Sequence, residues 1–308
     1  MHFFRIFLYP SDISLELLRE STWYFGYNPR LCFRAAHSKA ALVMKRENVM
    51  LQIRNVARRE SNISQLLNSF RRGDSDVSHS VFAMFPRNEE RLLTQCKFRD
   101  VSRWALDELL KQYKTRRADA AADFYEQISG VSEAAALWDP VFERMVLNYL
   151  DGVSPKHKFS IRGLTSSGKM TWSIPNRIRR FTFRRDSDFI DAITDAVRVK
   201  KPRHFVPFSR NFIAVDSIIY DPNSVLTFIQ VTVARKHEIN VLGLERIQNW
   251  LQKSTPLGAL RPSGNRPWRF IFIVPSSNQR SFKLQRLGGD NQGKWAQKVH
   301  QYVLGLYV

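Results

Sequence analysis

The sequence predicts an α/β protein, in which a mainly helical N-terminal region precedes a domain with a central mixed sheet flanked by helices. Three observations carry this prediction. Apolar residues recur at helical spacing through much of residues 1–130. After residue 130, helical and strand-like segments alternate, which is typical of a layered α/β domain. The length of 308 residues suits about two domains. We therefore expect domains at 1–130 and 131–308.

Helices are expected in the N-terminal region over residues 12–25, 39–70 and 100–113, with one short strand over 80–85. Asp12 is the expected cap of the first helix, and Asp100 or Ser102 caps the third. The long second helix breaks near Ser61 and Asn62.

The C-terminal region begins with a helix over 133–150, in which Asp139 and Pro140 form an N-cap and N1 pair. Expected strands follow at 158–162, 170–174 and 180–183, then a helix at 186–197. An apolar hairpin comes next, with strands at 215–220 and 226–233 and a turn at 221–224. The pattern closes with a helix at 242–252, a strand at 268–274 and a helix at 294–304.

Polar residues interrupt both strands of the hairpin. Asp216 lies in the first strand, and Gln230 and Thr232 lie two apart in the second, on one face. A buried aspartate is costly unless a partner or a metal compensates it. A carboxylate facing an oxygen ligand suits a hard cation such as Mg²⁺. In the simpler interpretation, Asp216 meets an arginine or a backbone amide.

The charge balance points to a polyanionic partner. Lys and Arg outnumber Asp and Glu by 48 to 28, for a formal charge of +20. Nucleic acid is the first candidate and an anionic membrane surface the second. No apolar run approaches the roughly 20 residues that span a bilayer, and the apolar start MHFFRIFLYP is too short for a convincing signal peptide. Two cysteines, Cys32 and Cys96, argue against a disulfide scaffold and fit an intracellular protein.

The positive charge is concentrated in residues 156–210, which contain 14 Lys and Arg against 4 Asp and no Glu. Arginines alternate there with apolar residues in strand-like sequence: Arg177, Arg179, Arg180, Arg184 and Arg185. Such a surface would follow phosphates without reading bases, DNA being favoured over RNA. The alternative is a sheet edge that its charges protect from pairing. No feature of the sequence sets an oligomeric state.

One segment, Gly163 to Lys169, approaches the P-loop pattern. Met170 stands where that pattern needs a Ser or Thr for Mg²⁺, and no helix follows to hold the phosphates. We interpret the segment as a hairpin turn and expect no ATP site in this chain.

The order of a helix Glu, a strand Asp and a Gln-x-Thr tripeptide resembles the restriction-endonuclease-like PD-(D/E)xK nuclease fold. The resemblance implies that Glu143, Asp216 and Gln230 hold Mg²⁺ or Mn²⁺, which polarises a scissile phosphate and activates water. Thr232 stands where the pattern has Lys. Lys236 is the expected substitute for the cation that stabilises the transition state, unless it is simply solvated.

More narrowly, four segments resemble the C-terminal domain of Crinkler and retrotransposon-hot-spot proteins: LWDPVFERMVLNYL (137–150), NFIAVDSIIYD (211–221), FIQVTVARKHEI (228–239) and QYVLGL (301–306). Three others resemble the end of the P-loop ATPase module that precedes that domain: FGYNPR (25–30), DVSRWALDELL (100–110) and ADFYEQISG (122–130).

The Crinkler resemblance implies a metal-dependent nuclease-like domain that acts on or binds DNA, in an effector or a mobile-element-associated protein. It would work in the nucleus or elsewhere inside a cell, including a host cell to which it is delivered. Two alternatives stay open. One is a catalytically degenerate module that binds nucleic acid or a host partner. The other is a truncated product that has lost the ATPase core on which its helical half would pack.

Overall fold

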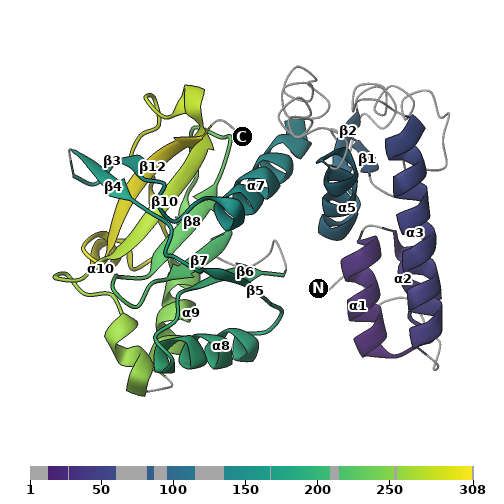
Figure 1. Ribbon diagram of the computed structural model, residues 1–308, viewed down its shortest axis with the longest axis horizontal. Helices are drawn as coiled ribbons and strands as arrows, with labels where there is room; N and C mark the ends of the chain where they lie inside the picture. Colours follow the sequence, from purple (N-terminus) through teal and green to yellow (C-terminus); the bar gives the residue numbers. More distant parts are fainter. Residues whose placement is uncertain are drawn as a thin grey trace. The chain divides into compact units, whose positions relative to one another are not determined.

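The computed structural model describes residues 13–26, 28–59, 82–86, 96–114, 135–166, 168–208, 215–252 and 255–306 (Figure 1). The chain divides into two compact units, Met1–Val141 and Phe142–Val308. The division falls inside helix α7 (Ala135–Gly152). The expected cap Asp12, the expected helix break at Ser61 and Asn62, and the segment 122–130 lie outside the described residues. The first helix is capped instead by Ser14, whose side chain accepts from the Leu17 amide.

Helices dominate the described part of the N-terminal unit, as the sequence predicts. They are α1 (Leu15–Phe25), α2 (Pro29–Ala35), α3 (Lys39–Arg59) and α5 (Arg103–Lys114). Strand β1 (Phe82–Pro86) was expected, and it pairs antiparallel with β2 (Cys96–Asp100), which the sequence analysis missed. Ser102 caps α5, because its Oγ accepts a hydrogen bond from the Ala105 amide at 3.1 Å.

The turn between α1 and α2 depends on its glycine. Gly26 has φ 46°, and a Cβ atom added there would lie 1.8 Å from the carbonyl oxygen of Val101. Only a residue without a side chain fits this position. Asn28 then caps α2 by accepting from the Leu31 amide at 3.1 Å, and Pro29 occupies the first turn. Within the FGYNPR segment, Asn28, Pro29 and Arg30 therefore start helix α2.

The C-terminal unit is built on a mixed sheet of eight described strands, in the order β4-β3-β12-β10-β8-β7-β6-β5. Their bounds are β3 (Phe159–Gly163), β4 (Lys169–Trp172), β5 (Arg179–Phe183), β6 (Arg203–Pro207), β7 (Ser217–Tyr220), β8 (Thr227–Val231), β10 (Trp268–Pro275) and β12 (Val299–Leu306). Strands β12, β10 and β8 are mutually parallel, as are β5 and β6, and the other neighbours are antiparallel. The predicted α/β class with a mixed sheet is confirmed.

Helices cover both faces of this sheet. On one face, Phe205, Ile218 and Phe228 join an apolar cluster with α8 (Asp186–Arg198) and α9 (Val241–Gln252), and we call it the α8–α9 face. Neighbouring strand residues point to opposite faces. His204, next to Phe205, contacts Asp151 of α7 at 2.7 Å, so α7 lies on the other face, the α7 face. In Figure 1, α8 lies beside β5 and β6.

Phe189 of α8 is the point where helices and strands of the α8–α9 face meet. Its ring lies 5.2 Å from that of Phe183 in β5, 5.0 Å from that of Phe205 in β6 and 5.4 Å from that of Trp250 in α9. Burying an aromatic side chain of this size stabilises the fold by roughly 2–3 kcal/mol, beyond which ring contacts add a little more.

The expected final helix over 294–304 is wrong. Residues 292–296 form a short helix, α10 (Gln292–Ala296), and strand β12 begins at Val299 after a turn. Trp295, Val299, Tyr302 and Val303 fit helical spacing, but Val299 and Val303 equally fit one face of a strand. Pairing decides, because β12 runs parallel to β10 along its whole length, from Trp268 opposite Val299 to Pro275 opposite Leu306.

The start of helix α7 and the presence of strand β6 differ from the expectations, whereas the hairpin between β3 and β4 agrees with them. Helix α7 begins at Ala135, so Pro140 lies inside the helix and Asp139 is not its cap. A proline there removes one backbone hydrogen bond without ending the helix. Strand β6 was not anticipated. The Gly163–Lys169 turn is confirmed as a hairpin, because β3 and β4 pair antiparallel with Arg162 opposite Lys169.

Two short parallel strands, β9 (Ile239–Asn240) and β11 (Leu287–Gly288), lie outside the main sheet. In the part of the chain that the structure describes, no helix has the length and apolar character needed to cross a membrane.

Candidate functional site

The hairpin that the sequence predicts is present. Strands β7 and β8 pair antiparallel, with Ser217 opposite Ile229. The turn between them is held by Asp221, whose Oδ1 accepts from the Asn223 amide at 3.0 Å and whose carbonyl accepts from the Ser224 amide at 3.1 Å. This local turn sets the register, and the register brings the start of β7 beside the end of β8.

The hairpin joins two of the predicted site residues. One carboxylate oxygen of Asp216, Oδ2, accepts from Gln230 Nε2 at 2.7 Å and from the Val231 amide at 2.7 Å. The Asp216 amide donates to the Ile229 carbonyl at 3.0 Å. Gln230 is 8% exposed and lies opposite Phe272 of β10, on the α8–α9 face. The simpler interpretation, in which Asp216 accepts a hydrogen bond from a backbone amide, agrees with its contact to the Val231 amide.

These contacts do not form a set of oxygens that converge on one point. Gln230 turns its N–H group, not its carbonyl oxygen, toward the carboxylate. A divalent cation needs oxygen ligands on all sides, so the pair as it stands does not fit one. Among the described residues, no group of three or more His, Cys, Asp or Glu side chains is arranged to hold a metal ion.

The residues that follow Gln230 play separate parts. Thr232 is buried, its amide donates to the Ile273 carbonyl at 3.0 Å, and its Oγ1 accepts from the Ala234 amide at 3.1 Å. Lys236 lies exposed in the irregular segment after β8. The amide of His237 donates to Gln285 Oε1 at 2.6 Å. The strand therefore ends before Lys236, which is presented to solvent.

Glu143 is buried, at 8% exposure, on α7. Later residues of the same helix contact the α7 face of the sheet, because Asn148 accepts from Arg180 at 3.4 Å and Asp151 contacts His204. Asp216 and Gln230 belong to the α8–α9 face. The predicted trio thus comprises one contacting pair and a glutamate on the helix that covers the other face.

The predicted basic residues separate into two groups. Arg177, Arg179, Arg184 and Arg185 are exposed, on strand β5 or directly beside it. Strand β5 is an end strand in the order of the sheet. The Arg184 guanidinium lies 4.1 Å from the centroid of the Phe208 ring, which orients it. These four arginines form what we call the β5 edge.

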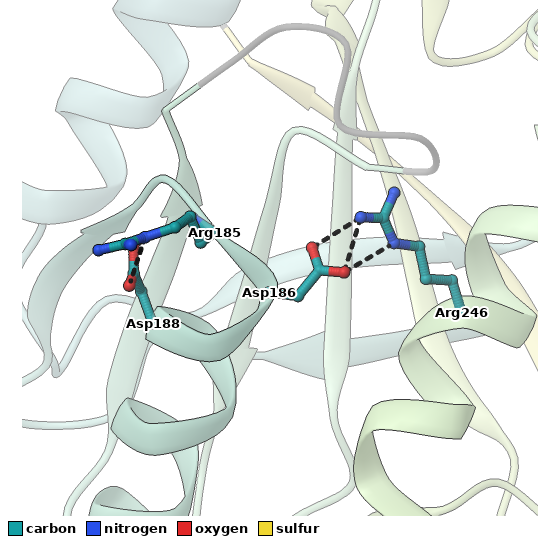
Figure 2. A network of polar contacts seen from close by, with 4 residues as sticks. All are labelled: Arg185, Asp186, Asp188 and Arg246. Carbon is teal, nitrogen blue, oxygen red and sulfur yellow. Dashed lines mark hydrogen bonds and ion pairs between the residues drawn. The ribbon is translucent and has the colours of Figure 1, made fainter. Parts of the chain in front are cut away.

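Acidic residues at the start of α8 organise part of this edge (Figure 2). Asp188 Oδ2 accepts from the backbone amides of Arg184 at 3.2 Å and Arg185 at 3.0 Å, and the Arg185 side chain lies 3.5 Å away. Burial alone would raise the pKa of Asp188, but these amide donors and the two guanidiniums lower the pKa below its usual value. Asp186 binds Arg246 of α9 through contacts of 2.7 Å, so the two helices are tied together.

Arg180 belongs elsewhere. Its Nε lies 2.8 Å from Asp151 Oδ2, and the other oxygen of Asp151 lies 2.7 Å from His204 Nδ1. Arg180 and His204 are directly opposite each other on β5 and β6. One carboxylate of α7 thus holds a cation and an imidazole of the sheet. Arg180, whose side chain is 26% exposed, therefore belongs to the α7 face rather than to the β5 edge.

His204 is a residue that the sequence analysis did not single out. It is 1% exposed, and its Nε2 has no hydrogen-bond partner in the described part of the chain. Ser217 Oγ, on the same face of the neighbouring strand, is likewise without a partner among described residues. Burial lowers the pKa of His204 below its usual value, although the Asp151 carboxylate acts to raise it. The available signal was a single histidine between Arg203 and Phe205 in a strand-like run.

No protein-family model, no curated protein and no solved structure matches this chain. The resemblance to the C-terminal domain of Crinkler and retrotransposon-hot-spot proteins, with the nuclear or host-cell role that it implies, therefore stays a prediction made from the residues.

Proposed function

We propose that the C-terminal unit binds nucleic acid, DNA before RNA, through the β5 edge. The observation that carries this proposal is the exposure of Arg177, Arg179, Arg184 and Arg185 along an end strand of the sheet. They belong to the stretch 156–210, with 14 Lys and Arg against 4 Asp. So dense a set of cations attracts a polyanion and raises its rate of encounter.

Binding at this edge acts on phosphates rather than bases. Each guanidinium offers parallel N–H donors that match two oxygens of a phosphate. Phosphate contacts fix the position of a nucleic acid without reading its sequence. If four phosphates are neutralised, affinity should fall roughly 100-fold between about 50 and 200 mM salt.

Binding without hydrolysis is the form of this function that the hairpin favours. Asp216 accepts two N–H donors through one carboxylate oxygen. Thr232 is buried where a nuclease of this pattern carries a lysine, and Lys236 is exposed beyond the end of β8. These features supply neither a clustered set of oxygen ligands nor a cation beside one.

Metal-dependent cleavage of DNA is the second candidate, and one observation favours it. Asp216 and Gln230 meet across adjacent strands, in the order that the PD-(D/E)xK resemblance implies. In that case Asp216 and Gln230 would hold Mg²⁺ or Mn²⁺, after the Gln230 amide turns its oxygen toward the ion. Glu143, the third ligand that the resemblance implies, lies on the helix that covers the other face, so a further ligand would have to come from elsewhere. The ion would polarise the phosphate and activate water.

The test measures binding and cleavage of the same labelled duplex. The full chain is compared with a variant in which all four β5-edge arginines become glutamine. The matched control replaces four exposed arginines of the N-terminal unit in the same way: Arg19, Arg34, Arg54 and Arg58. Each protein is titrated at two salt concentrations, with Mg²⁺ or with a chelator.

We expect the β5-edge variant to lose DNA affinity by at least tenfold more than the control, with a shallower salt dependence. Equal losses in the two variants would mean that the edge charges only protect a strand edge from pairing. Cleavage that requires Mg²⁺ and disappears in Asp216→Ala would establish the second candidate instead. Binding that ignores Mg²⁺, with no cleavage, supports the first.

A further inference from the structure

A basic pocket lies at the opposite end of the sheet from the β5 edge. It encloses about 280 Å³ and is lined by Ser160, Arg162, Lys169, Gln279 and Arg280. Strands β3 and β4, which form one end of the strand order, supply the first three, and the segment around the short helix η5 (Ser276–Asn278) supplies the others. Three of the five are cations, and no acidic residue is among the described residues that line it.

The wall of this pocket is held firmly against the sheet. Arg162 Nη2 donates to the carbonyl oxygens of Gln279 at 2.6 Å and Phe282 at 2.7 Å. A Cβ atom added at Gly305 of β12 would lie 2.8 Å from the Gln279 side chain, so the segment rests directly on the strand. Arg162 therefore joins strand β3 to the segment after η5, which contains Gln279 and Phe282. Its guanidinium is ordered before any ligand arrives, and such preorganisation reduces the entropy cost of binding.

The cations of the pocket repel one another. Arg162 and Lys169 are directly opposite each other in the register of β3 and β4, an arrangement in which like charges are destabilising. Lys169 and Arg280 are exposed, and neither forms an ion pair with a described residue. An anion placed between them would relieve this repulsion and accept their N–H donors.

We propose that this pocket binds a phosphate group. Phosphate offers several strong acceptor oxygens and up to two negative charges. These match the charge and the remaining N–H donors of Arg162, whose Nη2 is already used by the two carbonyls, and the exposed donors of Lys169 and Arg280. The volume is at the small end of ligand sites, as expected for a phosphate with little more than its immediate substituent. The phosphate belongs either to a nucleic acid or to a free phosphorylated small molecule.

Pyrophosphate is the probe, titrated calorimetrically into the full chain at constant ionic strength without divalent metal. The variants are Lys169→Gln, Arg280→Gln and the double variant, which alter exposed side chains and leave Arg162 with its two carbonyl contacts. Lys294→Gln, which removes an exposed lysine of α10 that does not line the pocket, is the matched control. Circular dichroism verifies that each variant is folded.

We expect each single variant to weaken pyrophosphate binding about tenfold, since each removes a charge-assisted hydrogen bond. The double variant should lose measurable binding, and Lys294→Gln should bind like the parent protein. Failure of the parent protein to bind pyrophosphate, or unchanged affinity in the double variant, would overturn the proposal.

Duplex DNA separates the two sources of phosphate. If the double variant loses affinity for both pyrophosphate and DNA, the pocket takes a phosphate of the nucleic acid. If it loses only pyrophosphate, the pocket takes a free phosphorylated small molecule. Nucleic-acid binding by the β5 edge can fail independently, because pyrophosphate binding does not involve those arginines.

Discussion

Two polar clusters lie on opposite faces of the same sheet, and they differ in how their hydrogen bonds are completed. On the α8–α9 face, one oxygen of Asp216 receives both the Gln230 side chain and the Val231 amide. On the α7 face, Asp151 holds His204 and Arg180, yet His204 Nε2 has no partner among described residues. The first cluster connects two strands of one hairpin. The second connects a helix to two strands.

This difference separates a cluster that local chain geometry produces from one that only the tertiary fold produces. Asp216 and Gln230 are 14 positions apart and are joined by a single turn. Asp151 and His204 are 53 positions apart, and only the packing of α7 on the sheet brings them together. The long-range cluster should matter more for stability, since each of its groups depends on a partner from another element and His204 is almost completely buried.

Removal of the shared carboxylate is the change that tests this difference most strongly. Asp151→Ala removes the carboxylate that His204 Nδ1 and Arg180 Nε share, in a setting where His204 is 1% exposed and the Arg180 side chain 26%. We expect the free energy of unfolding to fall by about 2–3 kcal/mol, less than for a fully buried pair because the Asp151 side chain is 28% exposed. Urea unfolding followed by tryptophan fluorescence measures it.

The matched control for Asp151→Ala is Asp195→Ala on α8. Asp195 also contacts two arginines, Arg198 at 2.9 Å and Arg203 at 3.8 Å, but its side chain is 46% exposed. Exposed pairs contribute little, so we expect a loss of about 0.5 kcal/mol or less. Equal losses for the two variants would show that the α7-face cluster has no special role.

The hairpin cluster should respond more weakly. Asp216→Ala leaves the Gln230 amide and the Val231 N–H without their acceptor, and we expect a loss of about 2 kcal/mol. Asp216→Asn keeps one carbonyl oxygen as an acceptor and should cost about half as much. The same unfolding curves, repeated with Mg²⁺, decide whether the carboxylate also serves a metal. Stabilisation of the parent protein by Mg²⁺ that both variants abolish would contradict the metal-free interpretation.

Sequence patterns predicted those features whose cause is local. Continuous apolar runs identified β8 and β10, and the turn at Asp221 identified the hairpin with its contact between Asp216 and Gln230. Strand β12 was mistaken for a helix because Val299, Tyr302 and Val303 fit helical spacing, although Val299 and Val303 also fit one face of a strand. Its parallel pairing with β10 is a long-range fact that a local pattern cannot contain.

The same limit applies to the arginines of the candidate binding surface. Five arginines of similar spacing were assigned to one basic surface. Four are exposed, but Arg180 pairs with Asp151. Alternation along β5 places Arg180 on the α7 face. That Asp151 lies close enough to pair with it depends on how α7 packs on the sheet. Likewise, nothing local to His204 reveals its partner on a helix.

The smallest expected effect is a pH dependence that belongs to the α7-face cluster alone. Burial lowers the pKa of His204 in the folded protein. The Arg180 charge lowers this pKa further, whereas the Asp151 carboxylate acts to raise it. In the unfolded chain, the imidazole has its ordinary pKa of about 6.5. The unfolded state therefore binds more protons at mildly acidic pH. The stability that depends on neutral His204 is present above about pH 6.5 and is lost as the pH falls toward the folded pKa.

His204→Asn isolates this effect, because the asparagine amide can still donate to Asp151 but does not titrate. Between about pH 7 and pH 5, we expect the parent protein to lose more stability than the variant, because only the parent has an imidazole whose pKa is lower in the folded state. Urea unfolding at several pH values measures the two profiles. Asp216→Asn, on the other face, should run parallel to the parent protein over this range, since it leaves His204 unchanged. Parallel profiles for the parent protein and His204→Asn would mean that the imidazole keeps its usual pKa in the folded protein. The clusters on the two faces would then differ in their contacts but not in how their stability depends on pH.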